Sequence, residues 1–284
     1  MIVVGATGVE LVDHGVLPGK SMLDALDGAC NVPSVSIPDR GVGEDVSGAF
    51  FSRARRQVVS YTVGYPLGHA KGSELPLVVM LHGEGGNHAS AFGGSTPAQV
   101  LGVRALRQPL APVALVTVDG GHGYWHPHPS DDPMGMVVHE LIPMLQGWGL
   151  GRGRHLIGTM GISMGGYGAV LFGELHPQLF RAVAAISPAV WTSYAQASGV
   201  NAAAYDSAAQ FARYDAVTHA ALLDRTPVRI ASGFEDPFHP GVVALADALG
   251  SHAEVDFSGG CHTAPFFDSQ LAPSLTFLAE HLAG

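Results

Sequence analysis

The sequence predicts an α/β fold with a mostly parallel central sheet, helices on both faces and an antiparallel N-terminal edge. From about residue 76 onward, apolar runs that end at glycine or a polar residue alternate with helix-like stretches. This alternation is typical of a parallel sheet whose two faces are covered by helices. The segment 48–66 is rich in Val, Tyr and Phe and alternates in part, which predicts an antiparallel hairpin at the sheet edge.

Each element follows from its local pattern. Continuous apolar runs suit strands buried on both faces of a parallel sheet, and they occur at 76–83, 113–121, 155–161, 182–189, 228–233 and 253–260. The stretches between and after them predict helices at 95–107, 134–147, 165–175, 239–250 and 269–282. The longer connection 190–226 is a candidate cap insertion over a site. Residues 1–46 predict an irregular arm with short strands, which leaves 47–284 as one domain.

The composition and net charge argue against some classes of binding partner. The chain has 284 residues, of which 47% are hydrophobic and 13% charged. A soluble domain usually has about 25% charged residues, so we expect a large buried core. The formal net charge is −10 and the longest basic cluster is "RARR" at 53–56, which argues against nucleic-acid or anionic-membrane partners. No apolar run approaches the roughly 18 residues of a membrane span.

The cysteines and the N-terminus bear on the cellular location. Cys30 and Cys261 could form one disulfide, but we favour two reduced thiols. The start "MIVVGATGVELVDHG" has no basic segment, and its apolar run is short and interrupted by glycine, unlike a signal peptide. We therefore expect a cytoplasmic protein. The oligomeric state does not follow from the sequence.

The stretch "TMGISMGGYGAV" (159–170) contains the pattern G-x-S-x-G around Ser163. An apolar strand precedes it and a helix-like segment follows it, which is the context of a nucleophile held on a sharp turn. Gly161 and Gly165 provide the small residues that such a turn requires. The alternative is a glycine-rich turn with a structural serine.

A nucleophilic serine needs a base and an acid that orients the base. In a sheet of this kind they follow in the order Ser, Asp or Glu, His. Asp236 follows the strand at 228–233, and we favour it over Glu235. His262 follows the strand at 253–260, and it is a better candidate than His239 or His252.

The same chemistry needs donors for an oxyanion. One candidate is the backbone amide of Met164, directly after the serine. The second should come from the loop "HGEGG" (82–86), where the amide of Glu84 or Gly85 is the candidate and His82 is expected to brace the loop.

A histidine-rich loop, "DGGHGYWHPHPSDDP" (119–133), follows the strand at 113–121. Its histidine spacing does not fit a defined zinc site, so we expect no metal and no cofactor. Tyr124, Trp125 and His126 are candidates to line a substrate pocket, as are Tyr167 and Trp191 among the aromatic residues near loop ends.

Five motifs in this order, "HGEGG", "VTVDGGHGYWHP", "GISMGGYGAV", "GFEDPFH" and "GGCHTAPFF", resemble the esterase branch of the α/β-hydrolases. That branch includes esterase D (S-formylglutathione hydrolase), feruloyl esterases and mycolyltransferases. The resemblance covers about 50–284 and implies an α/β-hydrolase fold and the triad Ser163, Asp236 and His262. The residues after His262 are "TAPFF" where the family often has Ser and an aromatic residue, so the relatives' substrates are not carried over.

The expected function is that of a serine esterase acting through an acyl-enzyme. Its substrate would be a small-molecule, glycolipid or carbohydrate ester. One alternative is an acyltransferase that passes the acyl group to a sugar or glycerol hydroxyl. Another is a non-catalytic binding protein on a hydrolase fold.

Overall fold

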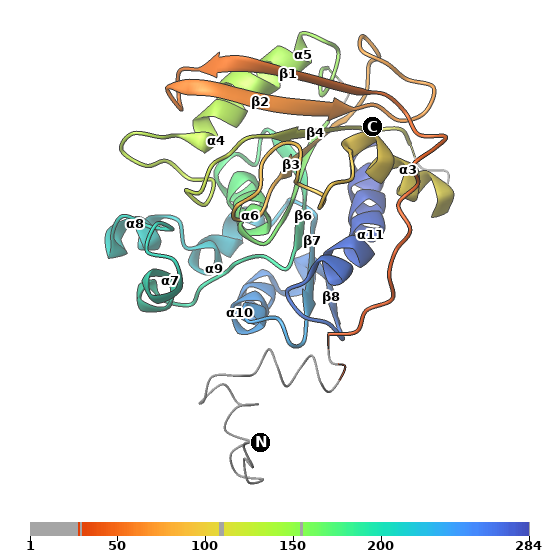
Figure 1. Ribbon diagram of the computed structural model, residues 1–284. Helices are drawn as coiled ribbons and strands as arrows, with labels where there is room; N and C mark the ends of the chain where they lie inside the picture. Colours follow the sequence, from red (N-terminus) through yellow and green to blue (C-terminus); the bar gives the residue numbers. More distant parts are fainter. Residues whose placement is uncertain (1–27, 29, 108–110, 154–155, 284) are drawn as a thin grey trace, which may run out of the picture.

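A single mixed sheet forms the centre of the molecule in the computed structural model, which describes residues 28, 30–107, 111–153 and 156–283 (Figure 1). Its strand order is β1-β2-β4-β3-β5-β6-β7-β8. β1 pairs antiparallel with β2, and β2 pairs antiparallel with β4, whereas all later pairs are parallel. The strands are β1 Asp45–Ser52, β2 Gln57–Gly64, β3 Leu77–Leu81, β4 Ala114–Val118, β5 Ile157–Ile162, β6 Phe180–Ile186, β7 Val228–Gly233 and β8 Ala253–Ser258.

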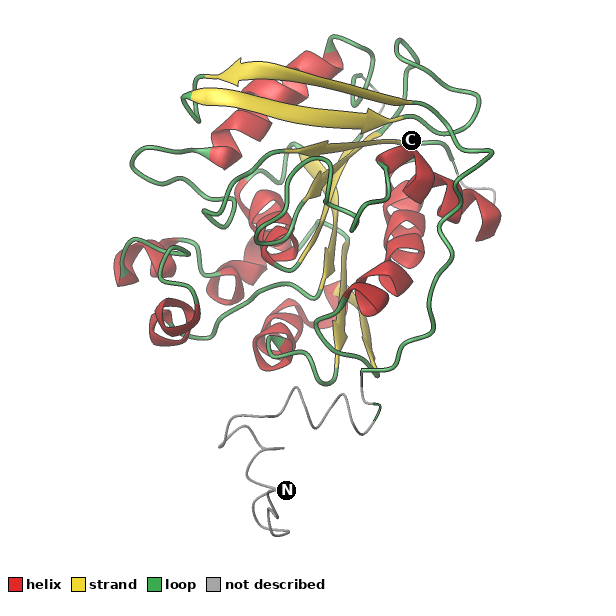
Figure 2. Cartoon of the chain, in the orientation of Figure 1, coloured by secondary structure: helices red, strands yellow, loops and turns green. Residues whose placement is uncertain are grey.

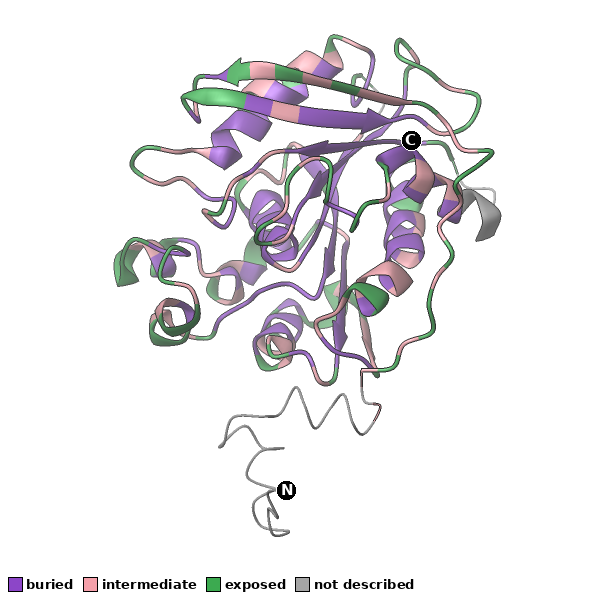
Figure 3. Ribbon diagram, in the orientation of Figure 1, coloured by how far each residue is buried: buried purple, intermediate pink, exposed green. Residues whose placement is uncertain are grey.

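Helices cover both faces of the sheet, as Figure 2 shows. α3 (Pro97–Arg107) and α11 (Ala264–Leu282) lie on one face, where α11 packs against β5, β6 and β7 and α3 packs against β2, β4 and α11. α6 (Met164–Leu175), α10 (His239–Leu249) and the helical segment α4-η1-α5 (133–146) pack on the other face. The central strands are buried on both sides (Figure 3), which explains their continuous apolar sequences.

The predicted fold is confirmed: a mostly parallel sheet with helices on both faces and an antiparallel edge. Most boundaries differ from the predicted ones by a few residues, and two of these differences have a physical reason. α11 begins at Ala264, five residues before the expected start, because Pro265 is readily accommodated in the first turn of a helix. β6 ends at Ile186, since 187–189 turns away beside the serine loop.

The connection 190–226 contains four short helices: α7 Tyr194–Val200, α8 Ala208–Arg213, α9 Ala216–His219 and η2 Ala220–Leu223. The helices α7, α8 and α9 each begin after a residue whose side chain accepts hydrogen bonds from amides of the first turn. These residues are Ser193, Ser207 and Asp215. These caps explain why a segment of modest hydrophobicity folds into separate short helices.

The N-terminal arm is described only in part, since 1–27 and 29, with the expected short strands, lie outside the described residues. The segment 30–44 has no strand, and it runs from β1 along α3 toward the loop after β8 (Figure 1). Its path is fixed by contacts with that helix: a Cβ on Gly102 would lie 3.0 Å from Pro38 and Val42.

A disulfide joins the two cysteines, which corrects the prediction of reduced thiols. The Cα atoms of Cys30 and Cys261 are 4.9 Å apart although 231 positions separate them. The sequence could not reveal this proximity because it depends on the path of the arm. Disulfides persist mainly in oxidising compartments, so the cysteines no longer support the expected cytoplasmic location.

Candidate active site

Ser163 lies on a sharp turn between β5 and α6. Its φ is 57° and its ψ is −120°, a backbone conformation that L-residues rarely adopt. Two glycines permit the turn. A Cβ on Gly161 would lie 2.0 Å from the carbonyl oxygen of Gly165, and a Cβ on Gly165 would lie 1.9 Å from the carbonyl oxygen of Leu81. The turn therefore requires glycine at both positions and places the serine side chain at the carboxyl edge of the sheet.

The side chains of Ser163, His262 and Asp236 form one hydrogen-bonded chain. Nε2 of His262 lies 2.8 Å from Oγ of Ser163. Nδ1 of the same ring lies 2.8 Å from Oδ2 of Asp236. Each residue follows a different strand, β5, β7 or β8, at its carboxyl end. The three residues expected to meet are thus brought together with the imidazole between the hydroxyl and the carboxylate.

Asp236 is fixed by its surroundings. Its side chain is fully buried, whereas that of His262 is 23% exposed. The second carboxylate oxygen, Oδ1, accepts a hydrogen bond of 2.9 Å from the backbone amide of Phe238. The backbone amide of the neighbouring Glu235 donates a hydrogen bond to the carbonyl of Gly260. The side chain of Asp236 is the one that contacts Nδ1 of His262.

The loop after β3 lies beside Ser163. The amide of Gly86 donates to the carbonyl of Gly83, which closes a turn with Gly85 at a φ of +73°. His82 is buried and braces this loop, because its Nδ1–H donates to the Gly83 carbonyl and its Nε2 accepts from the Gly120 amide. Burial lowers the pKa of His82, which is consistent with a neutral ring that donates at one nitrogen and accepts at the other.

A cavity of about 410 Å³ opens at Ser163 and His262. Its wall is mostly apolar, with carboxylates at two points. The residues that define its character are Gly83, Glu84, Phe92, Ile162, Phe267 and Asp268. Glu84 lines this cavity, whereas Gly85 is not among its lining residues.

The five residues predicted to line the substrate pocket lie elsewhere. All are buried, and none lines the cavity at Ser163: Tyr124, Trp125, His126, Tyr167 and Trp191. A substrate-binding role for these five residues stays a prediction, and the contacts that they make here are with other parts of the protein. The rings of the loop after β4 turn inward, because they pack against other aromatic side chains, some of them in the connection 190–226.

Individual contacts show what these rings do instead. The Trp125 indole N–H donates to the carbonyl of His82, and its side chain fills the space that Gly168 leaves open. Tyr167 donates its hydroxyl hydrogen to the backbone carbonyl of Tyr214 in the connection 190–226. Trp191 packs at 4.9 Å against Phe238, which in turn contacts the ring of His262. These residues therefore stabilise the loop after β3, the connection 190–226 and the position of the His262 ring.

The histidine-rich loop is held by protein contacts. His126 is buried and stacked between aromatic rings, and Nε2 lies 2.9 Å from the carbonyl of Ala204. Burial lowers its pKa to about 4. Within the described part of the chain, no group of three or more His, Cys, Asp or Glu residues is arranged to hold a metal ion.

Phe92 and Asp268 are among the cavity residues that were not predicted from the sequence. Phe92 lies eleven positions after the end of β3, in a loop whose path brings it back to the serine. Asp268 lies in the first turns of α11, whose start was predicted too late. No local pattern marks either one, since both owe their place to the way a connection folds.

Comparison with known proteins identifies the family. The sequence profile of the family described as "Putative esterase" matches residues 57–251, more than half of the chain. The chain belongs to this esterase family. It is a carboxylic ester hydrolase with the α/β-hydrolase fold. Among the curated proteins, none matches the sequence of this esterase.

Solved structures share the fold of the esterase. A ferulic acid esterase superposes with a TM-score of 0.72 at 18% identity, over 85% of this chain and 99% of the other. An S-formylglutathione hydrolase from Agrobacterium tumefaciens gives 0.68 at 18% identity, over 88% and 99%. A fluorophosphonate-binding serine hydrolase from Staphylococcus aureus gives 0.66 at 15% identity, over 84% and 99%. At these identities the likeness concerns the fold alone. No helix among the described residues of the esterase combines the length and apolar character needed to cross a bilayer.

Proposed function

We propose that the protein is a serine esterase in which Ser163, His262 and Asp236 act as a catalytic triad through an acyl-enzyme. The observation that carries the proposal is the chain of two 2.8 Å contacts through the His262 ring. A carboxylate can only accept at Oδ2, so Nδ1 of His262 carries a hydrogen and Nε2 is left to accept from the serine hydroxyl. This is the tautomer that a general base requires.

The first half of the reaction forms the acyl-enzyme. Nε2 of His262 takes the hydroxyl proton as Oγ of Ser163 attacks the ester carbonyl carbon. Buried Asp236 holds the ring and stabilises the imidazolium that results. The imidazolium then donates its proton to the oxygen of the leaving alcohol as the ester C–O bond breaks.

The second half releases the acid. His262 takes a proton from water, the hydroxide attacks the acyl carbonyl, and the bond to Oγ breaks as the ring returns the proton to Ser163. The 23% exposure of the His262 side chain gives water a path to this base.

Two backbone amides, those of Met164 and Glu84, are assigned as the donors that stabilise the oxyanion in both tetrahedral intermediates. Met164 is the first residue of α6. Its amide therefore has no acceptor within the helix and lies at the positive end of the helix dipole. Glu84 is preferred over Gly85 because it lines the cavity that contains Ser163. Removal of one such donor typically lowers turnover about 10²- to 10³-fold.

The test is Ser163→Ala measured on a short-chain ester. We expect kcat to fall by about 10⁴-fold or more, because the base alone cannot form the acyl-enzyme. Ser251→Ala is the matched control. Ser251 is exposed just before β8, at the amino end of this strand, whereas the triad lies at the carboxyl ends of the strands. Hydrolysis that survives Ser163→Ala at the rate of the control would contradict the proposal.

Transfer of the acyl group to a sugar or glycerol hydroxyl would use the same acyl-enzyme. It differs only in the acceptor that enters after the first alcohol leaves. Product analysis with and without added glycerol separates the two outcomes, and we propose hydrolysis as the main one. The family assignment leaves no reason to retain a non-catalytic binding protein.

A further inference from the structure

The loop after β3 (82–93) forms much of the wall of the cavity at Ser163. The residues of this loop that line the cavity are Gly83, Glu84, Gly86 and 90–93. The loop also carries the Glu84 amide that is proposed to stabilise the oxyanion. The backbone hydrogen bonds within the loop each join residues three positions apart and so close single turns. Single turns do not fix the loop over the serine, so its position depends on contacts with other segments.

These contacts come from β4 and from the loop that follows it. At the start of the loop after β3, Nε2 of His82 accepts from the Gly120 amide, and the carbonyl of His82 accepts from the Trp125 indole. In its middle, Nδ1 of His122 lies 2.6 Å from Oε1 of Glu84. Both side chains of this pair are exposed, so the pair contributes little to the position of the loop.

Asp119 holds the far part of the loop through His88. Oδ1 of Asp119 accepts from the backbone amide of His88 at 2.8 Å and from its Nδ1 at 2.8 Å. Because a carboxylate only accepts, Nδ1 of His88 carries a hydrogen. The backbone carbonyl of His88 accepts from the hydroxyl of Thr117, in β4, at 2.7 Å. His88 is thereby fixed to the carboxyl end of β4 through its amide, its carbonyl and its ring.

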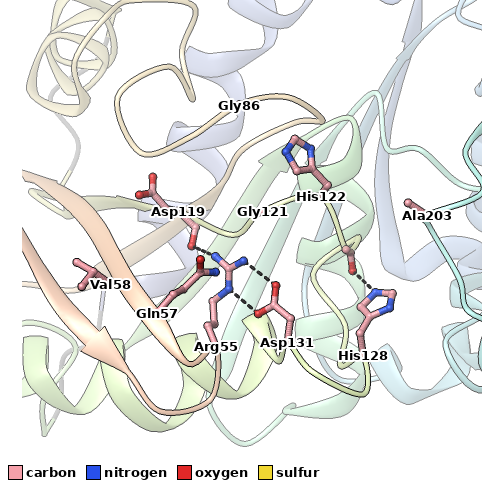
Figure 4. A pocket seen from close by; sticks show the side chains of 11 residues that line it. Arg55, Gln57, Val58, Gly86, Asp119, Gly121, His122, His128, Asp131 and Ala203 are labelled. Atoms are coloured by element: carbon pink, nitrogen blue, oxygen red, sulfur yellow. Dashed lines mark hydrogen bonds and ion pairs between the residues drawn. The ribbon is translucent and has the colours of Figure 1, made fainter.

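Asp119 is itself held by the antiparallel edge of the sheet. Its Oδ2 accepts from the Ser60 amide in β2 at 3.1 Å, and its own amide donates to the Ser60 carbonyl at 3.0 Å. Its carbonyl accepts from Nη1 of Arg55 at 2.7 Å. Figure 4 shows the Arg55 guanidinium between Asp119 and Asp131, whose two carboxylate oxygens accept from Nε and Nη2 of Arg55. The Arg55 side chain is buried, so Asp119 is a rigid attachment point for the loop.

The charge of Asp119 suits this role. Burial alone would raise the pKa of its carboxyl group, but the hydrogen bonds from His88 and Ser60 lower that pKa below its usual value. The group is therefore a carboxylate at neutral pH, and hydrogen bonds to a charged acceptor are stronger than those between neutral groups. Within the described chain, none of the hydrogen bonds of Asp119 involves the triad. An effect of Asp119 on the reaction must then pass through the loop.

We propose that Asp119 is a positioning residue, which holds the loop after β3 through His88 and so keeps the Glu84 amide in place for the oxyanion. Glu84 lies four positions before His88, and without Asp119 the amide and ring of His88 lose their acceptor. A displacement of about 1 Å at a catalytic group can lower the rate about 10²-fold. This inference rests on the proposed esterase function and concerns the same site.

The experiment measures p-nitrophenyl butyrate hydrolysis by Asp119→Ala, with the working sites counted by fluorophosphonate titration. We expect kcat per titrated site to fall by about 10- to 100-fold, because a displaced oxyanion donor no longer stabilises the transition state. KM should change by less than about 3-fold, since the oxyanion is absent from the bound substrate.

A transition-state analogue distinguishes positioning from a loss of folded protein. Oγ of Ser163 adds to the carbonyl carbon of butyl trifluoromethyl ketone, the hydroxyl proton passes to Nε2 of His262, and the carbonyl oxygen becomes an oxyanion. The Ki of this ketone should rise in Asp119→Ala by the factor by which kcat/KM falls. A purely structural role would lower the number of titrated sites and leave both kcat per site and Ki unchanged.

Two further variants test the link through His88. Asp119→Asn keeps the shape and one acceptor oxygen, so it should fold and lose less activity than Asp119→Ala, with Ki and kcat/KM again changing by one factor. In a double-mutant cycle, Asp119→Ala should lower kcat less when His88 is already replaced by alanine. Asp247→Ala is the matched control, because Asp247 is exposed on α10, and it should leave kcat and Ki unchanged.

The outcomes separate this inference from the proposed function. A wild-type kcat per site in Asp119→Ala, or a lower kcat/KM with an unchanged Ki, would overturn the inference, while the esterase proposal stands if Ser163→Ala is inactive. Independent effects of Asp119→Ala and His88→Ala would overturn the link through His88. If the wild type hydrolyses no ester, the proposed function fails and the inference falls with it.

Discussion

Single residues of this site are held by contacts outside their own segment. His262 receives its orientation from Asp236 on one side and from the rings of Phe238 and Phe267 on the other faces. The loop beside Ser163 depends on the neutral ring of His82. The types of the triad residues could be predicted because their chemistry requires them. The residues that support them could not, since Phe, Trp and His side chains also occur in protein cores for packing alone.

Glu174 provides a pH-dependent prediction. It is buried in α6, and neither carboxyl oxygen has a hydrogen-bond partner among the described residues. Burial, with a smaller effect of Asp215, raises its pKa to about 9. The unfolded chain releases this proton near pH 4.5 and the folded protein keeps it to about pH 9. The contribution of Glu174 to the free energy of unfolding therefore falls as the pH rises between these values.

Glu174→Gln should remove this contribution, because an amide of the same shape carries no charge. An uncompensated buried group costs about 1–3 kcal/mol, and each kcal/mol changes the Tm of a chain of this size by roughly 2–4 °C. We expect a higher Tm than wild type at pH 8.5 and a smaller difference at pH 5, measured by thermal denaturation. Glu280→Gln, an exposed change in α11, is the control. A Tm difference independent of pH would contradict the raised pKa.

At the scale of elements, the site is a consequence of parallel strands. Ser163, Asp236 and His262 each follow a strand, and the carboxyl ends of β5, β7 and β8 lie at one edge of the sheet. The strands were predictable because burial on both faces makes them continuously apolar. Once their positions are known, the order of the triad along the chain follows.

The connections were less predictable than the strands. The loop after β4 was expected to line the substrate pocket, but its aromatic residues are buried, and some of them pack against the connection 190–226. Of two adjacent carboxylates in this loop, Asp132 caps α4 (Pro133–Met136), whereas Asp131 binds Arg55 in the turn between β1 and β2. A sequence pattern cannot distinguish such inward and outward directions, because both depend on which distant segment packs on the loop.

At the scale of the whole molecule, the arm connects the two edges of the sheet. The segment 30–44 begins at the disulfide beside His262, after the edge strand β8, and ends at the opposite edge strand β1. It also contributes Ile37 to the apolar layer between the sheet and α11. The disulfide thus fixes both the arm and the loop that carries His262.

Reduction of the Cys30–Cys261 bond should therefore destabilise the protein. A native disulfide typically contributes about 2–4 kcal/mol, so we expect dithiothreitol to lower the Tm by several degrees. Thiol titration in denaturant should find no free thiol before reduction and two after it. The double variant Cys30→Ser, Cys261→Ser should have a low Tm that dithiothreitol does not change. Two free thiols in the untreated protein would contradict the disulfide.

Covalent labelling tests directly whether Ser163 is the nucleophile. A fluorophosphonate probe should form one adduct per chain, and peptide mass spectrometry should locate it on Ser163. The adduct should form much more slowly in His262→Ala, because the hydroxyl then has no base. An adduct on another residue, or labelling of Ser163 at an unchanged rate in His262→Ala, would contradict the account.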